Sequence, residues 1–154
     1  MLKKSIITFF GIGNLPVATG TFASFFSLIL LLFLNYYLSK ILFIIFFIIL
    51  LIISFFLVKE HIVKLDIKDS KEIVIDEVLG IYFILLFIKI DYNQLLLNFL
   101  IIFLLFRFFD ILKIFPINII EKKYDNAFGI IVDDLVAGFF SVLFFLIIFN
   151  FINF

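Results

Sequence analysis

Cysteine is absent from this chain, and histidine occurs once, as His61. The lack of cysteine excludes a disulfide framework, a thiolate metal site and a cysteine nucleophile. The single histidine excludes a lipid phosphatase that needs two placed histidines. Charged residues are also scarce, at 16% of the chain against about 25% in soluble domains. Because 12 basic residues balance 12 acidic ones, the sequence predicts no nucleic-acid partner.

Apolar sequence is what the chain has in excess, at 66% of its 154 residues against about 45–50% in soluble domains. A helix needs about 20 apolar residues to cross a bilayer. Three such segments contain no charged residue, at 22–38, 41–58 and 135–154. Two more are apolar but carry charged residues near their ends, at 73–90 and 95–115. The run from 22 to 58 is too long for one span and must fold back around 35–40.

The fold class that these segments predict is all-α, a polytopic membrane bundle formed by one domain over 1–154 with about five hydrophobic helices. The alternative has four spanning helices, with 73–90 entering the membrane only partway. Residues 5–10 are too short for a signal peptide before the glycines that follow, and we expect an interfacial or re-entrant segment there.

The distribution of lysine and arginine predicts the orientation, because cytoplasmic loops are enriched in them. With five spans, Lys40 and Lys89 lie on one side of the membrane. The N-terminus and the remaining basic residues lie on the other, which should be cytoplasmic; these are Lys3, Lys4, Lys59, Lys64, Lys68, Lys71, Arg107, Lys113, Lys122 and Lys123. We interpret Lys59, Lys64, Lys68 and Lys71 as a solvated loop that contacts anionic lipid.

Polar residues inside apolar sequence converge on this same side. The glycine-rich segment 11–24 leads into the first span, and acidic and basic residues stand at the ends of three others. The acidic residues are Asp76, Glu77, Asp110, Asp133 and Asp134, and the basic ones are Arg107 and Lys113. We therefore expect four separate segments to meet at one depth near the cytoplasmic face.

Carboxylates near a bilayer are costly unless they are paired or bound to a metal. Oxygen ligands without cysteine favour Mg²⁺ or Mn²⁺ over Zn²⁺. Arg107, Asp110 and Lys113 are spaced i, i+3, i+6 along one strip of a helix, where the two cations can hold Asp110 or face a ligand phosphate. Because neither a D-x-D motif nor a G-x-S-x-G elbow is present, metal-assisted attack by water or by a carboxylate remains.

Four blocks of the sequence, in order over about residues 9–141, resemble the motifs of the phosphatidylglycerophosphatase A family. The block G-x-G-x-x-P-x-x-P-G-T-x-G-S is matched by Gly11, Gly13, Pro16, Gly20, Thr21 and Ser24, with Thr19 and Ala23 as replacements. The block I-V-x-D-E-x-x-G is matched in full by residues 73–80. The block F-R-x-x-D-x-x-K-P-x-P is matched by Phe106, Arg107, Asp110, Lys113 and Pro116, with Ile114 as a replacement. The block G-G-x-G-I-x-x-D-D-x-x-A-G is matched by Gly129, Ile130, Asp133, Asp134, Ala137 and Gly138, with Asn126 and Ala127 as replacements.

The resemblance implies a lipid phosphatase of the bacterial inner membrane that converts phosphatidylglycerophosphate to phosphatidylglycerol and phosphate with Mg²⁺. Its implied active site lies on the cytoplasmic side. The five acidic residues Asp76, Glu77, Asp110, Asp133 and Asp134 would bind one or two Mg²⁺ ions or supply the base or nucleophile. Arg107 and Lys113 would bind the phosphate, and Gly20 and Thr21 would let the backbone approach it.

Two other functions compete with this interpretation. A transporter of ions or small solutes would use the acidic residues as a pathway, but it would place them near mid-membrane on several spans. A non-catalytic membrane scaffold is compatible with the replaced proline and glycine positions. The sequence predicts no oligomeric state.

Overall fold

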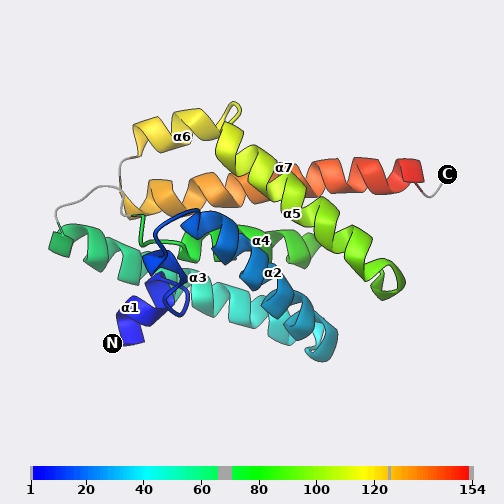
Figure 1. Cartoon of the computed structure of the whole chain (residues 1–154), viewed down its shortest axis with the longest axis horizontal. Helices are drawn as coiled ribbons and strands as arrows, with labels where there is room; N and C mark the ends of the chain where they lie inside the picture. The colour runs from blue at the N-terminus through cyan, green and yellow to red at the C-terminus, as the bar shows by residue number, and fades with distance from the viewer. Residues whose placement is uncertain (1, 66–70, 125, 153–154) are drawn as a thin grey trace.

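The computed structural model describes residues 2–65, 71–124 and 126–152, and all regular structure in these ranges is helical. The elements are α1 (Leu2–Ile7), the 3-10 turn η1 (Ile12–Asn14), α2 (Thr19–Tyr37), α3 (Lys40–Leu65), α4 (Ile75–Phe87), the 3-10 turn η2 (Tyr92–Gln94), α5 (Leu95–Leu112), α6 (Ile117–Lys123) and α7 (Ala127–Ile152). The all-α prediction is confirmed (Figure 1).

Four described helices, α2, α3, α5 and α7, are long and apolar enough to cross a membrane. Helix α2 ends at Tyr37 and α3 begins at Lys40, so the chain folds back where the sequence predicts it. Helix α4, in the predicted segment 73–90, has 13 residues. At 1.5 Å per residue it is only about 20 Å long, shorter than the hydrocarbon core of roughly 30 Å. Its length therefore favours the alternative in which this segment enters the membrane partway.

Helix α4 lies at the centre of the bundle and packs against α2, α3 and α7. Small residues make the contact with α7 close. A Cβ added at Gly80 would lie 2.9 Å from the Asp134 carbonyl oxygen, and one at Gly138 would lie 2.8 Å from the Gly80 carbonyl oxygen. Ala137 and Ser141, two further small residues on α7, are fully buried. The two helices that carry acidic pairs thus approach each other almost backbone to backbone.

The N-terminal segment supports the start of α4. The Val74 N–H donates a hydrogen bond to the Ile7 carbonyl oxygen at 3.1 Å. Gly13 packs so tightly on the backbone of Glu72 that an added Cβ would collide with the Glu72 carbonyl oxygen. Helix α1 and the turn after it, in the segment predicted to be interfacial, therefore form part of the tertiary structure.

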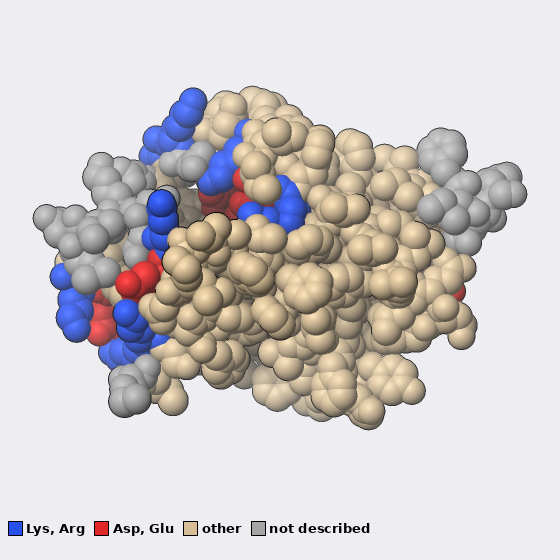
Figure 2. Space-filling model, in the orientation of Figure 1, with Lys and Arg blue, Asp and Glu red and all other residues tan. Residues whose placement is uncertain are grey.

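Charged side chains gather at one end of the molecule, which we call the charged end; it contains α1, the last turns of α3, α6 and the first turns of α7 (Figures 1 and 2). Two exposed ion pairs lie there, Lys3 with Glu60 at 2.7 Å and Lys4 with Glu72 at 3.0 Å. Lys40 lies at the opposite end, where it hydrogen-bonds the Leu86 carbonyl oxygen. The side of the membrane that the charged end faces stays a prediction.

Several helix boundaries differ from the predicted spans. Helix α7 begins at Ala127, well before the predicted residue 135, so Asp133 and Asp134 lie inside the helix. Helix α2 begins at Thr19, which places Gly20 and Thr21 in its first turn. Helix α3 continues to Leu65, so the predicted loop at Lys59 and Lys64 is wrong for these two residues. Lys68, from the same predicted loop, lies outside the described residues.

Candidate functional site

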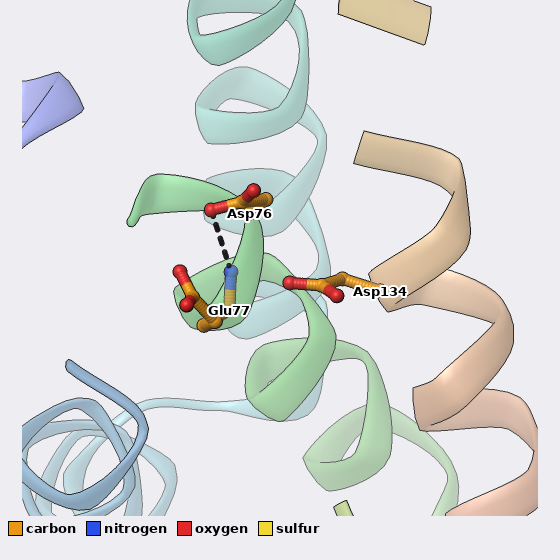
Figure 3. Close-up of side chains that lie close together, drawn as sticks. All are labelled: Asp76, Glu77 and Asp134. Carbon is orange, nitrogen blue, oxygen red and sulfur yellow. Dashed lines mark hydrogen bonds between the residues drawn. The ribbon is translucent and has the colours of Figure 1, made fainter. Parts of the chain in front are cut away.

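Three acidic side chains meet at the contact between α4 and α7, and we call Asp76, Glu77 and Asp134 the acidic trio (Figure 3). One carboxylate oxygen from each lies within 4.8 Å of the others. Asp76 and Glu77 stand in the first turn of α4, and Asp134 points toward them from α7. The close packing at Gly80 therefore holds the two sides of the trio at ligand distance.

Each adjacent acidic pair is fixed by the same local hydrogen bond. The Glu77 N–H donates to Asp76 Oδ1 at 3.1 Å, and the Asp134 N–H donates to Asp133 Oδ1 at 3.0 Å. Neighbouring positions on a helix lie about 100° apart. The oxygens of Asp76 and Glu77 nevertheless both reach the trio, whereas the two members of the α7 pair face different partners. Asp134 faces the trio, whereas Asp133 accepts a hydrogen bond from Lys113 Nζ at 3.0 Å through its other oxygen.

Arg107 and Asp110, near the end of α5, form the most direct ion pair of the site. Arg107 Nη1 lies 2.5 Å from Asp110 Oδ2 and 3.4 Å from Ser24 Oγ on α2. Both side chains are largely buried, with 15% and 13% of their surface exposed. Electrostatic interactions also link Asp110 to Asp134 and Glu77, so this pair borders the trio.

Lys113 does not continue the helical strip that its spacing predicts. Helix α5 ends at Leu112, and Lys113 has a left-handed backbone with φ of 42°. This turn directs its ammonium group to Asp133 on α7. The prediction of one strip from Arg107 to Lys113 is therefore wrong, although both cations still lie beside the acidic residues.

The first turn of α2 completes the site. Gly20 lies so close to Glu77 that an added Cβ would collide with Glu77 Oε1, and it would lie 3.3 Å from Arg107 Nη1. The first α-helical hydrogen bond runs from the Phe22 N–H to the Ala18 carbonyl oxygen. The N–H groups of Thr19, Gly20 and Thr21 therefore lie before the hydrogen-bond ladder, where helices bind anions.

Two other positions in this segment, Thr21 and Ser24, differ in their contacts. Thr21 is partly buried, and its side chain has no hydrogen bond among the described residues. Ser24, a motif position without a predicted role, is fully buried and donates a hydrogen bond to the Gly20 carbonyl oxygen at 2.7 Å. The four predicted segments thus meet at one place, from α2, α4, the end of α5 with Lys113, and α7.

The donor set fits a hard divalent cation. Five carboxylates surround the site, but only two cationic side chains, Arg107 and Lys113, lie among them in the described residues. Glu77 Oε2 is buried without a hydrogen-bond partner in the described part of the chain. A buried carboxylate oxygen in a site with excess negative charge is stabilised by a metal, and an all-oxygen set suits Mg²⁺. The first turn of α4 adds the positive end of its helix dipole.

The comparisons with known proteins agree on one family. Residues 5–149 match the family model described as phosphatidylglycerophosphatase A. The protein named phosphatidylglycerophosphatase A from Haemophilus influenzae is 34% identical over 135 residues, which cover 87% of this chain and 80% of that relative. No solved structure matches.

Proposed function

Because this chain belongs to the phosphatidylglycerophosphatase A family, and is thus a phosphoric monoester hydrolase acting on a lipid, we propose that it hydrolyses phosphatidylglycerophosphate to phosphatidylglycerol and phosphate with Mg²⁺. The observation that carries the proposal is the acidic trio beside Arg107 and the first turn of α2. Metal-assisted hydrolysis of a phosphate monoester needs metal ligands and anion donors in one place.

The acidic trio would hold the metal, since its three oxygens already lie close together. A bound Mg²⁺ would neutralise phosphate charge and lower the pKa of an attacking water. Asp110 and Asp133 are engaged by Arg107 and Lys113, so in this arrangement they orient the two cations. They become ligands to a second ion only if those cations turn to the substrate.

The phosphate would lie between Arg107 and the first turn of α2. The guanidinium group offers several N–H donors in one plane, which suits phosphate oxygens. The N–H groups of Gly20 and Thr21 lie at the α2 terminus, and a Cβ at position 20 would displace the Glu77 carboxylate. Ser24 Oγ accepts a hydrogen bond from the same Arg107 Nη1 that pairs with Asp110, and so helps to position this side chain.

The membrane setting explains how so small a chain can act on a lipid. The site lies toward the charged end, where a headgroup would reach it, while the acyl chains stay in the bilayer beside the helices. We place this end at the cytoplasmic face of the bacterial inner membrane, because most lysines and arginines lie there.

The test is release of phosphate from phosphatidylglycerophosphate by the protein purified in detergent, with and without Mg²⁺. We expect activity to require Mg²⁺ and to disappear with a chelator. Asp76→Asn and Asp134→Asn should each lower kcat/KM at least about 100-fold, because each removes one charged ligand. Asp91→Asn is the matched control, since Asp91 is a carboxylate that caps η2, beyond the opposite end of α4 from Asp76 and Glu77.

Full activity in both variants of the trio would contradict the proposed site. Full activity in chelator would contradict the metal. Uptake of a solute into proteoliposomes without any phosphate release would instead support the transporter.

A further inference from the structure

A basic cavity and an apolar groove lie one after the other along a single face of α3. The basic cavity, of about 410 Å³, is lined by α1, the last turns of α3 and Glu72. The apolar groove, of about 600 Å³, is lined by α1, α2, the middle of α3 and α4. On α3 the groove ends at Ile53 and the cavity begins at Leu57, one helical turn further on.

The charges of the basic cavity favour an anion. Lys3, Lys4 and Lys64 line it together with Glu60 and Glu72, which leaves one net positive charge. The buried Nε2 of His61, a further lining residue, has no hydrogen-bond partner within the described ranges. The cavity therefore offers both charge and an unused polar group to a ligand.

The groove suits an acyl chain rather than a polar ligand. Its walls are apolar side chains such as Phe46, Leu50 and Ile53 on α3 and Leu34 on α2. From Leu57 to Phe46 the helix rises about 16 Å, at 1.5 Å per residue. This matches one leaflet of a hydrocarbon core of roughly 30 Å.

We propose that the α1–α3 face binds a phospholipid with an anionic headgroup at a site that takes no part in catalysis, with the phosphate beside Lys64 and His61 and one acyl chain in the apolar groove. The lipid comes from the leaflet at the charged end. This site is separate from the acidic trio, because none of the trio lines either cavity.

Helix α1 connects this lipid to the candidate active site. Lys3 and Lys4 of this helix line the basic cavity, and Ser5 and Ile6 line the groove. The same helix accepts the hydrogen bond from Val74, two residues before Asp76. A lipid bound against α1 therefore steadies the turn that carries Asp76 and Glu77.

The chain contains no tryptophan, so a single introduced tryptophan reports on its own surroundings. Phe46→Trp places the reporter in the groove, and Ile48→Trp places it at similar depth on another face of α3. Both are reconstituted in phosphatidylcholine vesicles with increasing amounts of brominated phosphatidylglycerol, without substrate or Mg²⁺. We expect the Phe46→Trp emission to be quenched at a several-fold lower fraction of the anionic lipid, and both reporters to respond alike to brominated phosphatidylcholine.

The charge of the cavity is tested in the Phe46→Trp background. Lys64→Gln should weaken the preference for anionic lipid about fivefold, since a basic residue near the surface contributes roughly that factor. Lys122→Gln, on the exposed part of α6 at the same end, should leave it unchanged. Equal quenching of both reporters by both lipids, or a preference that Lys64→Gln does not alter, would overturn the proposal.

A second copy of the chain is another possible occupant of the groove. Weak quenching of Phe46→Trp by either lipid, together with dimer formation, would identify that occupant and reject the lipid. Because the measurement uses neither substrate nor metal, loss of the proposed phosphatase activity would leave its outcome unchanged.

Discussion

Replacing Gly20 with alanine tests the geometry of the candidate site without removing any charged group. The added methyl group would collide with Glu77 Oε1 and lie 3.1 Å from Glu77 Cδ. Because these atoms are the end of a side chain and not backbone, the Glu77 carboxylate moves while α2 keeps its place. A shift of about 1 Å at a reacting centre costs roughly 100-fold in rate, or about 2.7 kcal/mol in activation free energy.

The assay is kcat/KM for phosphate release from phosphatidylglycerophosphate, with the melting temperature of the same sample as the measure of folding. We expect Gly20→Ala to lose about 100-fold in kcat/KM and to melt within a few degrees of the unchanged protein. Combining it with Glu77→Asp, which shortens the colliding side chain by one methylene, should recover part of the loss relative to Gly20→Ala alone. Unchanged activity in Gly20→Ala would refute the proposed place of Glu77.

Three further predictions follow from the contacts of the site and its supporting helices. Gly138→Ala should lower the free energy of unfolding by about 1–3 kcal/mol, measured by denaturation in detergent, because its Cβ would lie 2.8 Å from the Gly80 carbonyl oxygen. Arg107→Lys should lower kcat/KM at least about tenfold and raise KM for the lipid. An ammonium group lacks the planar set of N–H donors with which a guanidinium group can bind the Asp110 carboxylate and a phosphate at the same time. Mg²⁺ should raise the melting temperature of the unchanged protein, and Asp134→Asn should abolish that rise. An equal rise in the unchanged protein and in the Asp134→Asn variant would show that the ion binds elsewhere.

The spanning helices could be predicted from the sequence because length and hydropathy are local properties. The turn between α2 and α3 follows from the excessive length of the run 22–58, and the structure has it at Leu38 and Ser39. The meeting of acidic residues was predictable for a similar reason. The acidic groups stand at the start of the segments 73–90 and 135–154 but at the end of the intervening segment 95–115. Because successive helices run antiparallel, this alternation brings the groups to one depth.

The partners of individual charges could not be predicted in this way. The backbone turns left-handed at Lys113, and the resulting pair with Asp133 joins residues on two different elements. Asp133 is buried inside α7, where its charge is paired with Lys113 from outside that helix. The role of Gly20 depends on the approach of Glu77 from α4, which no pattern within residues 11–24 reveals.

The hydrogen bond from Val74 to Ile7 has a practical consequence for protein engineering. It ties the amino-terminal helix to the turn that carries Asp76, whereas the end of α7 lies on the far side of the molecule (Figure 1). An affinity tag or fluorescent fusion should therefore be attached behind α7. The same addition ahead of Leu2 would disturb the contact between α1 and Val74 that helps to hold Asp76 and Glu77 in place, and would lower the yield of active enzyme.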